Sequence, residues 1–212
     1  MKSAVLRAAV PAIAAAAVLV AAPPPAAQSE VCDDVQVVFA RGTSEEPGIG
    51  RVGQAFVDDL RGRLGNRTIG VYAVNYPASL DFLAAADGAN DASAFIQNVT
   101  VQCPATRLVL GGYSQGAAII DVLASVPFPL IGFTNPLPMD VTNKVAALAV
   151  FGNPARRIGL PLTSSLFYGS KAIDLCNPGD PVCSSGDSIP AHRSYGPDGQ
   201  TSRAAAFVAA RL

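Results

Sequence analysis

The feature that most limits the fold of this chain is a set of short, almost wholly apolar runs of strand length. Val35–Ala40 and Val145–Phe151 show it best, because hydrophobic residues follow one another there with hardly any polar alternation. Strands of this composition are buried on both faces, which is typical of parallel sheets covered by helices. Shorter runs at residues 69–74, 108–110 and 172–175 have the same character.

The segments between these runs have helical periodicity. Residues 53–64 place four apolar side chains on one helical face: Phe56, Val57, Leu60 and Leu64. Residues 91–101, 117–123 and 202–212 are also expected to be helical. Strands that alternate with helices predict an α/β fold, here a three-layer α/β/α sandwich around a parallel sheet. A length of 212 residues fits a single domain of this kind.

The amino-terminal residues have the layout of a secretory signal peptide. Two basic residues come first, followed by the apolar run Ala8–Ala22 and a small-residue stretch that ends at Ala27. The run is shorter than the roughly 20 residues needed to span a bilayer. We therefore expect a signal peptide over residues 1–27 and one secreted, extracellular domain over residues 28–212.

The charge of the chain excludes several classes of partner. The sequence has 15 basic and 16 acidic residues, and loss of Lys2 and Arg7 with the signal peptide leaves 13 against 16, a net charge of −3. This balance predicts no binding to nucleic acid or to anionic membranes. We expect a small-molecule, lipid or polyester substrate and no integral membrane segment in the mature chain. The oligomeric state is not determined by the sequence, and a monomer is expected.

Export also decides how the four cysteines are interpreted. Cys32, Cys103, Cys176 and Cys183 are an even set in an oxidising compartment, which indicates disulfides. Four cysteines allow three pairings and the sequence alone selects none of them, although adjacency favours Cys176 with Cys183. Because the chain has no Cys-x-x-Cys pair and one histidine, we expect no metal site and no cofactor.

The strongest chemical signal is Gly112-Tyr113-Ser114-Gln115-Gly116, a G-x-S-x-G match. It lies directly after the predicted strand at 108–110 and before the predicted helix at 117–123, which is the context of a nucleophile elbow. Two glycines allow a sharp turn that exposes the serine Oγ, and the helix amino terminus favours negative charge nearby. A plain glycine turn is the alternative, but this placement predicts that Ser114 is a nucleophile.

A serine nucleophile needs a base, and His192 is the only histidine in the chain. A lone histidine is more often a surface or packing residue, but this one follows the last predicted strand, in a loop, in the order Ser, acid, His. Of the candidate acids, Asp174 lies inside a strand and Asp187 lies outside the adjacent cysteine pair, whereas Asp180 lies within that pair beside two prolines. A rigid carboxylate orients an imidazole best, so we favour Asp180.

An oxyanion hole needs two donors. One is the backbone N–H of Gln115, the residue after the nucleophile. The other is expected from Arg41-Gly42-Thr43-Ser44, which follows the first predicted strand. Gly42 permits close backbone approach, and Thr43 offers an N–H and a hydroxyl. A polar helix-capping turn is the alternative interpretation of this segment.

Taken together, these residues resemble the cutinase family of α/β-hydrolases, including the cutinase-like esterases of actinobacteria. The similarity covers nearly the whole mature chain. It rests on Val37–Thr43, Gly111–Gly116, the cysteine-bracketed Asp180 and Ala191-His192.

The resemblance implies a compact sandwich around a mainly parallel five-stranded sheet, without the large lid of true lipases. It implies Ser114, Asp180 and His192 as a catalytic triad, and Thr43 with Gln115 as the oxyanion hole. It also implies a disulfide between Cys32 and Cys103.

One stretch departs from the simplest cutinases. Pro127–Pro138 is longer and more apolar than the corresponding connection, and its prolines predict a surface loop that shapes an acyl groove. Other candidates for substrate binding are Leu80, Phe82 and Leu83, together with Ile189 beside the histidine. Ordinary packing is the alternative interpretation of each.

The predicted function is hydrolysis of carboxylic esters with short- to medium-chain acyl groups through an acyl-enzyme. An acetylxylan esterase is the nearest enzymatic alternative, because such enzymes share the fold and the elbow. A secreted binding protein that has lost catalysis is the alternative from another class.

Overall fold

The computed structural model describes residues 32–212. The expected signal peptide, residues 1–27, and the expected start of the domain at residue 28 lie outside the described residues. Within 32–212, no helix is both long enough and apolar enough to cross a lipid bilayer.

A five-stranded sheet forms the centre of the protein, and its strands follow the apolar runs of the sequence. The strands are β1 Val35–Ala40, β2 Ile69–Ala73, β3 Arg107–Tyr113, β4 Val145–Phe151 and β5 Ala172–Leu175. They lie in the order β2-β1-β3-β4-β5, and each neighbouring pair is parallel. The predicted α/β sandwich around a mainly parallel five-stranded sheet is confirmed, and the described sheet is parallel throughout.

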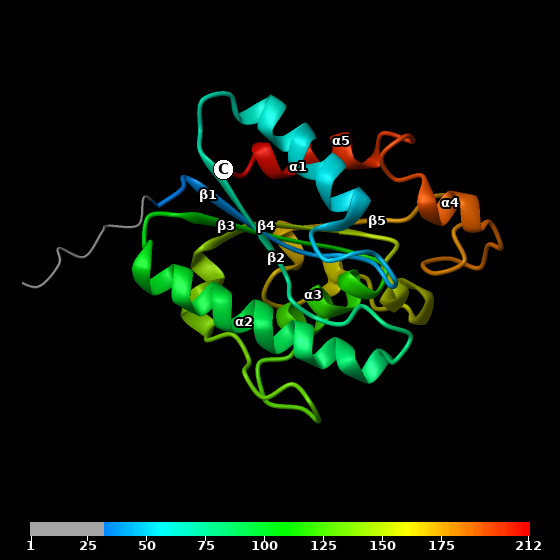
Figure 1. The fold of residues 1–212 in the computed structure, drawn as a ribbon, viewed down its shortest axis with the longest axis horizontal. Helices are drawn as coiled ribbons and strands as arrows, with labels where there is room; N and C mark the ends of the chain where they lie inside the picture. Colours follow the sequence, from blue (N-terminus) through cyan, green and yellow to red (C-terminus); the bar gives the residue numbers. More distant parts are fainter. Residues whose placement is uncertain (1–31) are drawn as a thin grey trace, which may run out of the picture. The chain divides into compact units, whose positions relative to one another are not determined.

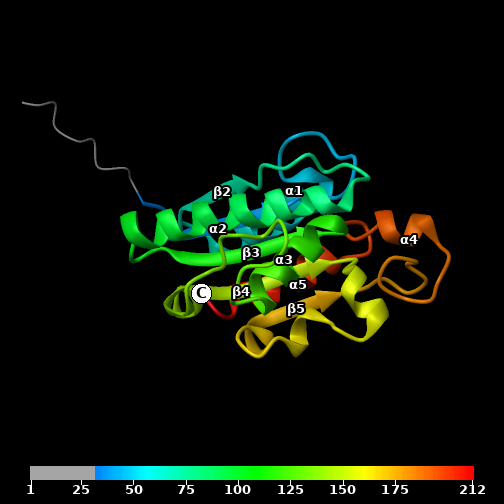
Figure 2. The same ribbon diagram turned by 90° about the horizontal axis from the view of Figure 1, so that it is seen from below.

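Helices cover both faces of this sheet, which accounts for its apolar strands (Figure 1). Helices α1 (Gly50–Leu64) and α5 (Gln200–Ala209) pack on one face, and α2 (Ala85–Gln102) and α3 (Gln115–Ser125) pack on the other. The short helix α4 (Ile189–Arg193) lies beyond the edge at which the strands end (Figure 2). Short 3-10 helices occur at Phe82–Ala84, Met139–Asn143, Pro154–Ile158, Leu162–Ser164 and Gly169–Lys171.

The packing of α1 follows from its sequence period. Its apolar stripe buries Phe56, Val57 and Leu60 completely. The Phe56 ring packs against Phe39 of β1 and Phe151 of β4, with ring centroids 6.2 and 6.0 Å away. Aromatic rings remove much apolar area from water, so this cluster fixes α1 on the sheet.

Helix α2 begins at Ala85, whereas the expected helix begins at Asp91. Its first turns hold mainly small residues, which leave no strong apolar period for a sequence analysis to detect. Those small residues have a packing function, because a Cβ on Gly88 would lie 2.6 Å from Cδ1 of Ile119 in α3. The two helices therefore approach each other closely at this point.

The segment that carries His192 also differs from the prediction, since it is the helix α4 and not a loop. Ser188 caps this helix by accepting a hydrogen bond from the Ala191 N–H, and Pro190 occupies its first turn. Serine at the cap and proline in the first turn are favourable at a helix start, but a single helical turn has too few residues to show a period.

Both disulfides that adjacency and the family resemblance indicate are present. Cys32–Cys103 joins the residues before β1 to the end of α2 across a sequence separation of 71. Cys176–Cys183 closes a separation of 7 directly after β5. The first mainly restricts the unfolded chain, and the second holds a short segment at the edge of the sheet.

We predict that Gly116→Ala destabilises the fold, because a Cβ at this position would lie 2.0 Å from the carbonyl oxygen of Ala40. The obstacle is the backbone of a central strand, so we expect a loss of about 3 kcal/mol in the free energy of unfolding.

The matched control is Gly62→Ala in α1, where nothing lies within 4 Å of the missing Cβ. There the same substitution is expected to stabilise the protein by about 0.5–1 kcal/mol. Urea unfolding followed by circular dichroism measures both variants, and equal effects would contradict the packing argument.

Candidate active site

Four parallel strands end at the same edge of the sheet, and the segments that follow them carry the predicted site residues. β1 leads into Thr43, β3 into Ser114, and β5 into the segment with Asp180. β4 leads into Gly152, which lies against His192. Ligands of open parallel sheets bind outside the carboxyl ends of the strands, which is where these residues gather.

Ser114 forms the sharp turn between β3 and α3. Its φ of 56° and ψ of −117° lie in a region that residues other than glycine rarely adopt. The motif glycines make the turn possible, because a Cβ on Gly112 would lie 2.3 Å from the carbonyl oxygen of Gly116. The Ser114 N–H donates to the Phe151 carbonyl oxygen at 2.9 Å, which ties the turn to β4. The strand–turn–helix context expected of the motif is therefore present.

His192 reaches Ser114 from α4. Its Nε2 lies 3.0 Å from Ser114 Oγ, within hydrogen-bond distance. Gly152 leaves room for the imidazole, since a Cβ there would lie 2.8 Å from His192 Cε1. The Tyr113 ring stacks on the imidazole with centroids 4.9 Å apart, and the Tyr113 hydroxyl donates to the His192 carbonyl oxygen at 2.7 Å. These contacts hold the ring in one orientation.

Asp180 lies beyond the imidazole and is completely buried. Its Oδ2 is 2.8 Å from His192 Nδ1, and its Oδ1 accepts from the Val182 N–H at 2.8 Å. The Cys176–Cys183 disulfide closes the segment around it. The arrangement fits an imidazole protonated on Nδ1, with Nε2 free to accept a proton from Ser114.

The two other candidate acids lie elsewhere. Asp174 is buried in β5, where its Oδ2 accepts hydrogen bonds of 2.8 Å from the Asn153 side chain and from a backbone N–H. Burial raises the pKa of Asp174, while those hydrogen bonds and Arg156 act in the opposite direction. Asp187 is exposed. Of the three acids, the structure brings Asp180 to the histidine.

Thr43 and Gln115 meet beside Ser114. Thr43 Oγ1 donates to Gln115 Oε1 at 3.2 Å, and Gln115 Nε2 donates to the Ser79 carbonyl oxygen at 3.1 Å. As the first residue of α3, Gln115 has a backbone N–H with no acceptor inside the helix. The hydroxyl of Thr43 is directed to the Gln115 side chain, so the two predicted oxyanion residues are linked to each other.

Sequence reasoning missed the network that fixes the Thr43 turn. Arg41 is 5% exposed, and its guanidinium donates to the carbonyl oxygens of Glu45 and Tyr76 at 2.8 and 2.7 Å. The Glu45 carboxylate accepts from the Gly42 N–H at 2.7 Å. An arginine after a strand is usually solvated, so no pattern in the sequence signals that this one is buried.

Tyr195 was missed as well. It is completely buried, and its hydroxyl donates to Asp180 Oδ2 at 2.5 Å. The one available signal is its place three residues after His192, where a tyrosine breaks an otherwise polar segment.

Three of the four substrate-binding candidates have side chains that the structure describes, and these three do not line one common groove. Leu83 lines an apolar groove of about 260 Å³, and the groove residues from α3 and from Pro127–Pro138 are apolar too. Leu80 and Ile189 are 78% and 50% exposed and do not line it. The side chain of Phe82 lies outside what the structure describes. Pro127–Pro138 is an irregular surface segment, as its prolines predict.

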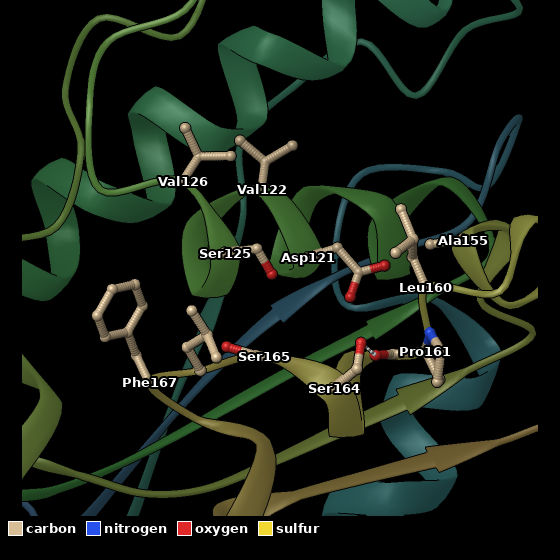
Figure 3. Close-up of a pocket in the computed structure, with 11 residues that line it drawn as sticks. Asp121, Val122, Ser125, Val126, Ala155, Leu160, Pro161, Ser164, Ser165 and Phe167 are labelled. Carbon is tan, nitrogen blue, oxygen red and sulfur yellow. Dashed lines mark hydrogen bonds between the residues drawn. The ribbon is translucent and has the colours of Figure 1, made fainter.

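A larger cavity, of about 360 Å³, opens between α3 and the segment 155–167 (Figure 3). Asp121 faces it from α3, with Ser164 on the opposite wall. Burial raises the pKa of Asp121 to about 7, although a hydrogen bond with Asn153 acts to lower it. Among the predicted site residues whose side chains the structure describes, none lines this cavity. The candidate active site is therefore identified by the contacts of Ser114, His192 and Asp180, and not by cavity size.

Comparison with known proteins identifies the family of this chain. The sequence model of the family described as Cutinase matches residues 31–212. The chain is 59% identical over 183 residues to phospholipase Culp4 of Mycobacterium tuberculosis, covering 85% of this chain and 80% of that relative. It is 49% identical over 195 residues to carboxylesterase Culp1 of Mycobacterium bovis, covering 88% of this chain and 85% of the relative.

Among solved structures, a Trichoderma reesei cutinase in complex with a phosphonate inhibitor has the same fold. Its TM-score is 0.68 at 36% identity, over 85% of this chain and 77% of that one. The similarity thus spans the sheet, its helices and the edge that carries Ser114. This chain belongs to the cutinase family and is a carboxylic ester hydrolase.

Proposed function

We propose that this protein hydrolyses carboxylic esters of aliphatic acids through an acyl-enzyme on Ser114. The observation that carries the proposal is the hydrogen-bond chain from Ser114 Oγ to His192 Nε2, at 3.0 Å, and from His192 Nδ1 to Asp180 Oδ2, at 2.8 Å. A serine hydroxyl by itself is a weak nucleophile, and this chain supplies a base and a group that orients the base.

In the first half-reaction, His192 Nε2 accepts the hydroxyl proton of Ser114 as Oγ attacks the ester carbonyl carbon. The tetrahedral intermediate carries its negative charge on the former carbonyl oxygen. When it collapses, the bond to the alkoxy oxygen breaks, and that oxygen takes the proton from His192 and leaves as the alcohol.

In the second half-reaction, a water molecule gives a proton to His192 Nε2 and attacks the acyl carbon. Collapse returns the proton to Ser114 Oγ and releases the carboxylic acid. Asp180 maintains the imidazole orientation and stabilises the imidazolium in both halves.

The proposed oxyanion hole consists of the backbone N–H groups of Gln115 and Thr43. The position of Gln115 supports this proposal, because Gln115 is the first residue of α3 and the helix dipole favours negative charge at that end. The 3.2 Å bond between the Thr43 and Gln115 side chains supports it further by fixing the β1 turn beside the elbow.

The acyl chain is proposed to lie in the apolar groove lined by Leu83, α3 and Pro127–Pro138. Two observations relate this groove to the nucleophile. Ala118, a groove residue, follows Ser114 by about one helical turn. The Ser79 carbonyl, in the segment that leads to Leu83, accepts a hydrogen bond from Gln115. Leu80 and Ile189 are proposed to contact the substrate outside the groove. Phe82 stays a proposed substrate-binding residue with no place assigned to its side chain.

The name of one relative adds a further class of candidate ester substrate. The phospholipase name of the Mycobacterium tuberculosis relative makes glycerophospholipids candidate substrates beside simple alkyl esters and polyesters. An acetylated xylan would leave the apolar groove empty, so the groove favours longer acyl chains over acetyl groups.

We also propose that the protein is secreted, with residues 1–27 as its signal peptide and residues 28–212 as the enzyme. Two disulfides among the described residues support an oxidising compartment.

Ser114→Ala and His192→Ala are each expected to lower kcat for p-nitrophenyl butyrate by about 10³-fold or more, because each removes one member of the hydrogen-bond chain. Ser125→Ala changes an exposed serine at the other end of α3 and is expected to retain wild-type activity. Mass spectrometry after treatment with a fluorophosphonate should find one adduct, on Ser114. Activity in Ser114→Ala close to that of wild type would refute the triad.

Ala118→Leu is expected to lower kcat/KM for p-nitrophenyl dodecanoate about tenfold and for p-nitrophenyl acetate less than twofold, since it fills the groove and leaves the hydrogen-bond chain intact. Ala206→Leu, at an exposed position of α5, is the matched control and should change neither. An equal loss on both esters would show that the acyl chain does not lie in this groove.

The substrate range of the wild-type protein separates the alternative functions. Hydrolysis of acetyl esters and acetylated xylan, with none of longer acyl esters, would favour an acetylxylan esterase. No hydrolysis of any ester would favour a binding protein.

Amino-terminal sequencing of the chain exported by an actinobacterial host is expected to give a first residue between Pro23 and Gln28, because the small residues there follow the apolar run. A secreted chain that retains Met1 would contradict the signal peptide, and a chain that stays in the cytoplasm would contradict secretion.

A further inference from the structure

Tyr195 has no part in the proton transfers described above, yet it is completely buried against the group that orients His192. It lies directly after α4, in a turn whose residues lead into α5. A buried tyrosine hydroxyl requires hydrogen-bond partners, and the partners of this one are the basis of the inference.

The Tyr195 hydroxyl donates to Asp180 Oδ2 at 2.5 Å, and the same oxygen is 2.8 Å from His192 Nδ1. Two donors from different segments therefore share one carboxylate oxygen, while Oδ1 accepts from the Val182 N–H. A carboxylate with three donors is fixed in position, and its negative charge is spread over all three.

The tyrosine itself is held firmly. Its ring packs edge-on against Phe151 and Tyr113, with centroids 5.8 and 5.9 Å away. The hydroxyl accepts from the Asn177 N–H at 3.3 Å and contacts Cys183 Sγ at 3.4 Å. Both of these partners belong to the disulfide-closed segment that carries Asp180, so one hydroxyl joins the acid, its loop and the sheet.

We propose that Tyr195 is a positioning residue of the active site, whose hydroxyl fixes Asp180 Oδ2 and limits the negative charge that this oxygen presents to His192. The inference rests on the proposed function of Ser114, His192 and Asp180. It predicts that the tyrosine sets both the geometry of the His192–Asp180 hydrogen bond and the pH at which the imidazole becomes a competent base.

The hydroxyl is suited to this task because burial and its bond to Asp180 raise the pKa of Tyr195, so it stays a donor through the working range of an esterase. Other ionisable groups lie around the same cluster. Tyr113 acts on Tyr195, and the charges of Arg193, Glu45 and Arg51 act on Tyr113. Asp198 accepts a hydrogen bond from Asn177. All of them are retained in the variants below.

Tyr195→Phe removes the hydroxyl and keeps the ring. Without this donor, Oδ2 presents more negative charge to the imidazolium, which favours the protonated form. Because the hydroxyl no longer fixes Asp180 Oδ2, the imidazole is oriented less well. We therefore expect kcat for p-nitrophenyl butyrate to fall about tenfold and KM to stay within twofold of the wild-type value. The acidic limb of kcat/KM against pH should move to higher pH by about 0.5 unit or more.

The matched control is Tyr168→Phe. Tyr168 is also buried, its hydroxyl bonds to Thr142, and it packs in the hydrophobic cluster on the other face of the sheet from Tyr195. Thermal unfolding of both variants measures the general effect of losing a buried hydroxyl. Tyr168→Phe should retain the wild-type kcat and pH profile. Equal changes in kcat and in the acidic limb for both variants would overturn the proposal.

A second readout does not depend on turnover. Because His192 is the only histidine, the proton on its Nδ1 gives a single assignable downfield resonance in proton NMR spectra. This resonance should move further downfield in Tyr195→Phe, as the bond to Asp180 strengthens. If Tyr195→Phe changes neither this resonance nor the pH profile, while Ser114→Ala abolishes activity, this inference is overturned and the proposed function stays intact. Hydrolysis that survives in Ser114→Ala would instead overturn the proposed function itself.

Discussion

Complete burial of the Asp180 carboxyl group is the constraint on which the chain after β5 depends. Removing a carboxylate from water is costly unless several hydrogen bonds replace its hydration. The donors come from three places: the neighbouring Val182 N–H, His192 on α4, and Tyr195 before α5. The chain after β5 must therefore fold back on itself, and the Cys176–Cys183 disulfide closes the turn that makes this possible.

The part of the candidate site around Ser114 depends on close backbone packing. Gly116 lets the start of α3 lie directly on the backbone of β1, since a Cβ there would meet the Ala40 carbonyl oxygen. The turn after β1 consequently lies beside the elbow, and Thr43 can bond to Gln115. The buried Arg41 also fixes that turn, because its guanidinium donates hydrogen bonds to the carbonyl oxygens of Glu45 and Tyr76. The proposed oxyanion hole needs this kind of support, because its donors must already point at the place where charge develops.

Helix α3 contributes to both the core and the surface. Ile120 and Leu123 are buried in the core, whereas Val122 lines the apolar groove beside Pro127–Pro138 and also the larger cavity near Asp121. The loop thus turns an exposed helix face into a groove with two apolar walls. Such a surface suits an aliphatic chain better than a sugar.

Much of this protein follows from its sequence alone. Unbroken apolar runs such as Val145–Phe151 determined a covered parallel sheet, because a strand with no polar face must be buried on both sides. The glycines around Ser114 determined a sharp turn between strand and helix, and the single histidine left one possible partner for the serine. These properties can be read from the sequence, because they depend on side-chain polarity, on backbone conformational freedom and on the number of histidines in the chain.

Only the tertiary structure decided which distant groups meet. The early start of α2 depends on Gly88 fitting against Ile119, and the burial of Arg41 depends on carbonyl groups far along the chain. The third donor to Asp180 is Tyr195, whose place shortly after His192 is only a weak signal. Its role arises from packing against β3 and β4, which brings its hydroxyl to the carboxylate. A sequence pattern records what each segment prefers to bury, whereas hydrogen bonds between segments form only after the sheet has brought their ends to one edge.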